Sequence, residues 1–382
     1  MSPTFHLLTG EFPPQQGGVG DYTDLLSRAL ASRGCQVHVW CPAAAPLETK
    51  SGVHVHRLSD WFGRLSRREL ADGVAAAPGC LLLQYVPNAL GMRGANLPFC
   101  FWLRRLSRRN VDVRVMFHEP YYYFAWQHPL RNGLAAVQRL MARVLLQASR
   151  VAYLSTATWV RYLSPLAPAG VPLIAVPIPS TVPDAAPPAS VNRWRARFLN
   201  GALGDPGCAP IVGHFGTFGD HLTEELSGVL PAILHGATGA RVVCIGRGSE
   251  RFTAMLAARH PDVAGRLQAT GPLAPGEVAA ALRACDVVVQ PYPDGVTTRR
   301  TSVMAGLANQ VATVTTDGAL TEPVWKVSGG VAMAAASDDD AISGAVTALL
   351  LDPAARKRLA EAGRQAYDAH FALERTVETL LR

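Results

Sequence analysis

A short segment in the second half of the chain, PYPDGVTTRRTS, holds the densest set of reactive and charged side chains. Nine of its residues supply one acid, one glycine, four hydroxyl groups and two arginines: Asp294, Gly295, Thr297, Thr298, Arg299, Arg300, Thr301 and Ser302, with Val296 between them. Paired arginines, hydroxyls and free N–H groups at a helix start suit a diphosphate, because they offer fixed charge and bidentate donors. An acid beside them can accept hydrogen bonds from sugar hydroxyls. The segment therefore predicts a site for a phosphorylated sugar.

A second candidate is the glycine-rich stretch GEFPPQQGGVGDYTDLL near the N-terminus. Gly17, Gly18 and Gly20 lie between an apolar run and a helical pattern for which Asp21 is the expected N-cap. Backbone N–H groups there could meet an anion at the positive end of the helix. A strained turn that only glycine can make explains the same residues equally well.

A third motif, FHEPYYYF, follows a predicted strand. His118 and Glu119 could provide a proton carrier and an acceptor, while Tyr121, Tyr122 and Tyr123 provide stacking surfaces and hydroxyls. A lone histidine at a strand end is usually structural. The neighbouring acid and tyrosines favour a functional role.

A fourth motif, HFGTFGDHLTEEL, also follows a predicted strand. Gly216 and Gly219 allow close backbone approach beside a helix start, and Thr217 and His221 are the nearest side chains. A simple turn is the competing explanation.

These motifs depend on elements that alternate between strand and helix, which predicts parallel sheets covered by helices. The predicted strands are 5–10, 36–41, 53–58, 80–86, 113–119, 150–156, 210–216, 240–246, 267–271, 286–292, 311–316 and 331–336. The predicted helices are 22–33, 99–109, 131–148, 224–234, 251–259, 277–284 and two segments after 351. A Pro/Ala-rich stretch, VPDAAPPAS, is the expected linker between two α/β halves. Ligands of such sheets bind at the carboxyl ends of the strands, so we expect the site in a cleft between the lobes.

The composition agrees with two globular domains. The chain has 382 residues, 49% of them hydrophobic and 17% charged, which a disordered chain would not show. The net charge of +7 favours anionic ligands or surfaces, but no nucleic-acid-binding motif accompanies it, so no nucleic-acid partner is expected. Seven scattered cysteines without a CxxC pair favour a reducing compartment. Without a signal-peptide pattern or a long apolar run, we expect a cytoplasmic protein.

Together these motifs resemble the retaining GT-B glycosyltransferases, specifically family 4 of the nucleotide-sugar-dependent enzymes (glycosyl transferase group 1). The resemblance rests on GEFPPQQGGVGDYTDLL, FHEP and PYPDG…SVMAGLANQVATVTTDG, and it covers essentially the whole length. It implies an α/β GT-B fold of two Rossmann-like lobes whose parallel sheets face a central cleft. The implied domains are an acceptor-side domain at 1–182, a nucleotide-sugar domain at 190–370, and a helix at 371–382 that returns to the first domain.

The resemblance also implies roles for individual residues. His118 would lie beside the transferred sugar, and Asp294 stands where the family has the first glutamate of a Glu–seven residues–Glu motif. The second glutamate position falls on Ser302, which would face the ribose or a phosphate. The implied donor-binding residues are Gly17, Gly18, Gly216, Thr217, Gly295, Val296, Thr298, Thr301 and Ser302, and the acceptor side would hold Glu119, Tyr122 and Tyr123.

One departure from the family concerns charge. The family usually places an Arg and a Lys after the first strand of the second lobe, whereas FGTFGDHL has neither. Arg299 and Arg300 are therefore the expected source of positive charge, and they join His118 and Asp294 as the predicted catalytic residues.

The implied reaction moves a sugar from a nucleoside diphosphate, UDP- or GDP-linked, to an acceptor hydroxyl with retention at the anomeric carbon. The acceptor could be a glycan, a lipid-linked glycan or a small metabolite. Neither a metal nor another cofactor is needed, because loop N–H groups and arginines can stabilise the leaving diphosphate. The three acids at 338–340 are expected to cap a helix rather than to bind a metal.

Two other classes remain open from the sequence. A non-catalytic GT-B protein that binds or regulates a partner is favoured by the missing basic pair and by Ser302. An NAD-dependent oxidoreductase is disfavoured, because Asp21, Tyr22 and Thr23 follow Gly20 where GxGxxG requires a third glycine.

The segment 97–110 has two explanations of its own. Its apolar residues Phe99, Trp102, Leu103 and Leu106 can share one helical face with four arginines around it. Such a helix could attach the protein peripherally to the inner face of a membrane. The ordinary alternative, an α/β-domain helix with its apolar face on the sheet, is favoured.

Overall fold

The structure is a computed structural model that describes residues 2–15, 17–42, 52–124, 129–199 and 209–382. The side chains of Leu130, Asp220 and His221 are outside this description, so the prediction for His221 is not addressed. The chain divides into two compact units, Met1–Ile178 with Leu373–Arg382, and Pro179–Ala372. Each unit is built around a parallel β-sheet covered by helices.

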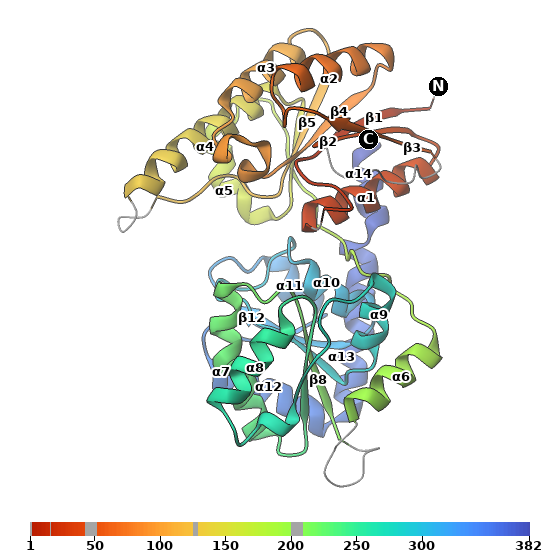
Figure 1. Cartoon of the computed structure of the whole chain (residues 1–382), viewed down its shortest axis with the longest axis vertical. Helices are drawn as coiled ribbons and strands as arrows, with labels where there is room; N and C mark the ends of the chain where they lie inside the picture. The colour runs from red at the N-terminus through yellow and green to blue at the C-terminus, as the bar shows by residue number, and fades with distance from the viewer. Residues whose placement is uncertain (1, 16, 43–51, 125–128, 200–208) are drawn as a thin grey trace. The chain divides into compact units, whose positions relative to one another are not determined.

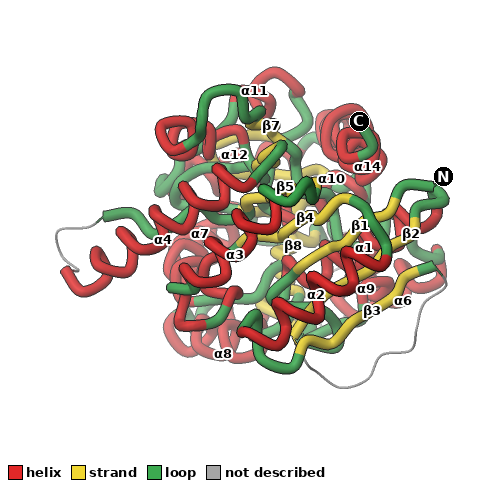
Figure 2. The backbone as a smooth tube through the Cα atoms, turned by 90° about the horizontal axis from the view of Figure 1, so that it is seen from above, coloured by secondary structure: helices red, strands yellow, loops and turns green. Residues whose placement is uncertain are grey.

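Seven parallel strands form the sheet of the first unit in the order β3-β2-β1-β4-β5-β6-β7 (Figure 2). They are β1 (Thr4–Leu8), β2 (Gln36–Pro42), β3 (Val53–Leu58), β4 (Cys80–Tyr85), β5 (Asp112–Phe117), β6 (Val151–Leu154) and β7 (Leu173–Ala175). The helices are α1 (Gly18–Ser32), α2 (Arg64–Ala76), α3 (Leu97–Ser107), α4 (Pro129–Ala148), α5 (Val160–Leu163) and α14 (Leu373–Leu380), with 3₁₀ turns at 87–90, 92–94, 157–159 and 164–166.

Six parallel strands form the second sheet in the order β10-β9-β8-β11-β12-β13. They are β8 (Ile211–Phe215), β9 (Arg241–Ile245), β10 (Leu267–Ala269), β11 (Val287–Gln290), β12 (Ala312–Asp317) and β13 (Ala332–Ala335). The helices are α6 (Pro188–Leu199), α7 (Asp220–Gly236), α8 (Ser249–Arg259), α9 (Pro275–Arg283), α10 (Thr301–Ala308), α11 (Pro323–Ser328), α12 (Asp339–Leu351) and α13 (Pro353–Ala366), with short turns at 264–266 and 367–371. Both strand orders have the doubly wound pattern typical of nucleotide-binding domains.

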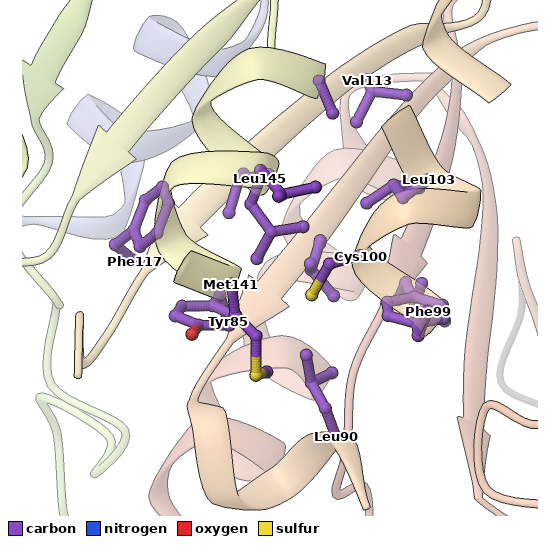
Figure 3. Packing of buried hydrophobic residues seen from close by; sticks show 14 of the residues in the cluster. Tyr85, Leu90, Phe99, Cys100, Leu103, Val113, Phe117, Met141 and Leu145 are labelled. Carbon is purple, nitrogen blue, oxygen red and sulfur yellow. The ribbon is translucent and has the colours of Figure 1, made fainter. Parts of the chain in front are cut away.

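Apolar side chains from both faces of the first sheet are buried, which explains why its strands are almost continuously hydrophobic. One core lies between the sheet and α2, α3 and α4; Figure 3 shows Phe99, Cys100 and Leu103 of α3 facing Met141 and Leu145 of α4. The opposite face packs against α1 and α14 (Figure 1). Arg114 of β5 also holds α14, because its Nη1 donates to the carbonyl of Leu380 (2.9 Å).

The structure confirms the predicted strands and the favoured explanation for the segment 97–110. Phe99 and Leu103 are almost completely buried and Leu106 is 9% exposed, so the apolar face of α3 packs on the sheet rather than on a membrane. The acids at 338–340 cap a helix as predicted: Asp338 Oδ1 accepts from Ala341 N (2.9 Å).

Two predictions were wrong. Asp21 is not an N-cap; α1 begins at Gly18 with Gly17 as its cap, one turn earlier than expected. VPDAAPPAS is not a free linker, because it lies in the second unit, Val182 is buried in a core there, and α6 begins at Pro188. Proline is tolerated in the first turn of a helix, so this proline-rich composition was compatible with a helix start.

Candidate active site

The predicted donor-binding loops of the second unit follow two neighbouring strands. β8 and β11 are hydrogen-bonded neighbours, with Val212 opposite Val287 and Gly213 opposite Val288. The loop 216–219 follows β8 and the loop 291–300 follows β11, so both lie at the carboxyl edge of this sheet. The fold therefore places Gly216 and Thr217 at the same edge as the Asp294–Ser302 segment.

The loop after β11 is held by a buried carboxylate that sequence reasoning missed. Glu322 is 4% exposed, and its Oε2 and Oε1 accept from Thr298 N (2.5 Å) and Thr298 Oγ1 (2.9 Å). Val296 N donates to the carbonyl of Thr316 (2.9 Å). Both contacts attach the loop to β12 and to the segment after it, and so they fix the backbone position from which Arg299 and Arg300 extend.

Gly295 is needed where this loop turns. Its φ is +88°, and a Cβ there would lie 2.2 Å from Thr321 Oγ1 and 2.5 Å from Gly318 N. This conformation favours glycine, and a side chain could not fit within this approach. Asp294 is exposed, and its carbonyl accepts from Leu320 N (2.8 Å), so its carboxylate is on an ordered backbone.

Arg299 and Arg300 are half-buried directly before α10, whose first residues are Thr301 and Ser302. The Arg300 guanidinium lies over the Tyr292 ring, 4.6 Å from its centroid, and Arg300 Nε is buried without a partner among the described residues. Ser302 Oγ is hydrogen-bonded to Tyr292 Oη (2.8 Å). Burial raises the pKa of Tyr292, which keeps it a neutral platform for the arginine.

His214, also missed from the sequence, supports the loop after β8. It is fully buried, and its Nδ1–H donates to the carbonyl of Val289 (2.8 Å). Burial lowers its pKa to about 4, so it is neutral at pH 7. A Cβ on Gly216 would lie 3.2 Å from His214 Nε2, which explains why a small residue stands there, while Thr217 is exposed.

A cavity of about 380 Å³ reaches Pro293, the residue before Asp294. It is lined by Glu224, Glu225, Pro293, Ser337 and Asp339. Burial raises the pKa of Glu225 and of Asp339. Carboxyl groups repel phosphate and accept hydrogen bonds from hydroxyls, so this cavity suits a neutral polyol better than a diphosphate.

In the first unit, an internal carboxylate occupies the start of α1. Glu11 Oε1 accepts from Val19 N (2.8 Å) and Gly20 N (3.0 Å), and a Cβ on Gly17 would lie 2.2 Å from Glu11 Oε2. An internal carboxylate therefore already accepts from two of the N–H groups at this helix start. A diphosphate contact at Gly17 and Gly18 stays a prediction.

His118 is 7% exposed at the end of β5. Its Nε2–H donates to Gln84 Oε1 (2.7 Å), and its ring meets the Tyr22 ring edge-on at 5.3 Å. Its carbonyl accepts from Ser155 Oγ (3.1 Å) and Trp159 Nε1 (3.2 Å). These contacts set the orientation of the His118 imidazole ring, so any role of His118 would use the ring in this orientation.

The expected acceptor-side residues follow His118. Glu119 and Tyr123 are exposed, and the Tyr123 ring lies 5.0 Å from the Tyr162 ring. Tyr122 is held more firmly, because its N donates to Gln138 Oε1 (2.9 Å) and its Oη accepts from Asn88 Nδ2 (2.6 Å).

Comparison with known proteins bears on what these loops do. The model of Glycosyltransferase Family 4 matches residues 16–161, and the model of Glycosyl transferases group 1 matches residues 209–352. The chain belongs to the GT-B glycosyltransferases. No curated protein matches this glycosyltransferase.

Solved structures share its fold at low sequence identity. A sucrose-phosphate synthase from Thermosynechococcus elongatus has a TM-score of 0.74 at 17% identity, with 99% of this chain and 97% of that chain covered. Anabaena HepE in complex with UDP and glucose has a TM-score of 0.70 at 10% identity, covering 99% and 98%. A UDP-forming α,α-trehalose-phosphate synthase from Burkholderia vietnamiensis has a TM-score of 0.66 at 15% identity, covering 100% and 96%. These likenesses establish the fold of the glycosyltransferase.

Proposed function

We propose that the protein is a retaining glycosyltransferase that moves a sugar from a UDP- or GDP-linked donor to an acceptor hydroxyl without a metal ion. The observation that carries the proposal is the loop 294–302, in which two half-buried arginines precede α10 on a backbone held by Glu322. Two fold relatives are a complex with UDP and a UDP-forming synthase, which supports a uridine donor. The six described cysteines are free and buried, which suits the cytoplasm as the place of reaction.

In this proposal the loop divides the donor between two environments. The diphosphate lies at the N-terminus of α10, where Arg299, Arg300 and backbone N–H groups offset the charge that grows on the leaving group. The sugar lies toward Asp294 and the acid-lined cavity, whose carboxyl groups accept from its hydroxyls. His118, held by Gln84, is proposed to lie beside the sugar from the acceptor-side unit.

The test is calorimetric titration of the protein with UDP and with GDP in the presence of a chelator. Wild type should bind one of them with micromolar affinity, and Arg299→Ala/Arg300→Ala should weaken binding at least a hundredfold, as expected for two charge-assisted contacts. Arg259→Ala/Arg358→Ala, which removes two exposed arginines from α8 and α13, is the matched control. Undiminished binding by the first variant would refute the assignment of the diphosphate to this loop.

A second candidate, a non-catalytic GT-B protein, is favoured by Glu11. Its carboxylate already satisfies two N–H groups at the start of α1, where the family resemblance predicts donor phosphate. Release of UDP or GDP from nucleotide sugars separates the two candidates, because a non-catalytic relative can bind nucleotide but releases none from the sugar.

A further inference from the structure

One surface of the first unit combines exposed apolar side chains with arginines. Residues 86–111 and 129–150, which contain α3 and α4, hold nine arginines and no aspartate or glutamate. Beside them, four large apolar side chains are exposed by 42–62%. The α2–α3 surface is defined here by the apolar residues Trp61, Leu65, Met92 and Phe101 and the exposed arginines Arg64, Arg93, Arg105 and Arg108.

Contacts between the turns show that this surface is continuous. Trp61 Nε1 donates to the carbonyl of Ala89 (3.0 Å), and a Cβ on Gly91 would lie 2.6 Å from the indole of Trp61, so Trp61 packs against the turn that carries Met92. Arg67 of α2 donates to the carbonyl of Pro98 (3.3 Å), where the exposed side of α3 begins. α2 and α3 lie side by side in Figure 1.

Three residues of the α2–α3 surface have strained backbone conformations. Trp61, Met92 and Arg93 are not glycines, yet their φ angles are +42°, +49° and +53°. Each such residue costs on the order of 1 kcal/mol. The exposed side of α3 then runs Pro98, Phe101, Arg105, Arg108 at helical spacing, while its opposite side is in the core.

We propose that the α2–α3 surface docks on an anionic phospholipid bilayer. Aromatic, methionine and leucine side chains insert at the headgroup boundary, and arginines pair with lipid phosphates. The charge of α3 and α4 complements an anionic surface, and on α2 the acids Glu69 and Asp72 are offset by Arg64, Arg67 and Arg68. A basic partner is excluded by this charge, and an acidic protein partner would not need four protruding apolar side chains, two of them on strained turns.

Docking there would set the membrane beside the expected acceptor-side residues. Asn88, in the turn before Met92, donates to Tyr122 Oη (2.6 Å). Gln138 of α4 links the same two residues, because it accepts from Tyr122 N and donates to Asn88 Oδ1 (3.4 Å). An acceptor anchored in the bilayer is therefore the class that this surface favours, a consequence that rests on the proposed function.

The test is co-sedimentation of the full chain with sucrose-loaded vesicles of phosphatidylcholine alone and with 30% phosphatidylglycerol. At 0.1 M NaCl the protein should sediment with the anionic vesicles only. Since each arginine near an anionic surface contributes about fivefold to partitioning, Arg105→Glu/Arg108→Glu should lower it by well over tenfold. Phe101→Ser should lower it severalfold and leave the dependence on salt unchanged.

Matched controls come from the second unit. Arg259→Glu/Arg358→Glu makes the same change in net charge, and Val327→Ser removes an apolar side chain that is 86% exposed. Both should sediment like wild type. The proposal is overturned if wild type ignores anionic vesicles, if it binds neutral ones equally, or if the controls lose as much binding as the α2–α3 variants. Nucleotide titration of the same variants keeps this outcome separate from that of the proposed function.

Discussion

Glu322 offers the sharpest test of how the second unit positions its arginines. Its carboxylate accepts from both the N–H and the hydroxyl of Thr298 and is 4% exposed. Each hydrogen bond to a charged group contributes about 1.5–3 kcal/mol, so loss of both in Glu322→Ala should lower the free energy of unfolding by about 3–6 kcal/mol. Relief of the desolvated charge offsets part of this loss, which places the expectation near the lower end.

Glu322→Gln provides the graded version of this change. Its amide oxygen can accept from Thr298 N while its amide N–H donates to Thr298 Oγ1, so only charge assistance is lost, at about 1–2 kcal/mol. The control is Asp317→Asn, which breaks an exposed ion pair with Lys326 (2.8 Å) and should cost under about 1 kcal/mol.

The assay combines urea unfolding with hydrogen exchange of residues 291–302 and titration with UDP. We expect stability to fall in the order wild type, Glu322→Gln, Glu322→Ala, and hydrogen exchange in this loop to be faster in the variants. UDP affinity should be at least tenfold weaker in Glu322→Ala, because a loop that samples several conformations binds only through the fraction in the binding conformation. Wild-type stability, exchange and affinity in the alanine variant would refute the conclusion that Glu322 holds the loop. If that variant does not fold, the glutamine variant carries the test.

Three further predictions concern Glu11, His214 and Gly295. Glu11→Ala should lower the free energy of unfolding by about 1–2 kcal/mol in urea titrations, because it leaves two N–H groups of α1 without their acceptor; an unchanged value would show that water replaces it fully. Burial lowers the pKa of His214 to about 4 in the folded protein, against about 6.5 in the unfolded chain. The free energy of unfolding of the second unit should therefore fall by about 1.4 kcal/mol per pH unit as the pH is lowered from 6.5 to 4, as measured by urea unfolding at each pH. His214→Gln should flatten this slope. Gly295→Ala should lower both the melting temperature and the affinity for UDP, because the new Cβ would clash with Thr321 and Gly318. A thermal shift assay with and without UDP measures both effects. If neither changes, the loop can move to make room for the Cβ, and the prediction is wrong.

Much of the fold could be predicted from the sequence because parallel strands buried on both faces are nearly continuous apolar runs. All twelve predicted strands are present, β7 was not predicted, and helices with a clear apolar stripe, such as α3 and α4, lie within a few residues of their expected bounds. α2, α5, α6 and α11 were missed. α2 and α6 carry many charged residues, and α5 and α11 have only four and six residues, so none showed a clean helical stripe.

The sequence by itself determined the architecture, the glycosyltransferase family and the polar segment after β11, because each can be recognised from short, local sequence patterns. Only the tertiary structure decided which side chains, distant in sequence, form hydrogen bonds with those segments. Glu11 and Val19 are eight residues apart, Gln84 and His118 thirty-four, Thr298 and Glu322 twenty-four. No local pattern links such pairs, because they meet only after the strands have set the register of the loops that carry them. The same holds for the α2–α3 surface, where folding buries the apolar face that the sequence displays and exposes Trp61, Met92 and Phe101 instead.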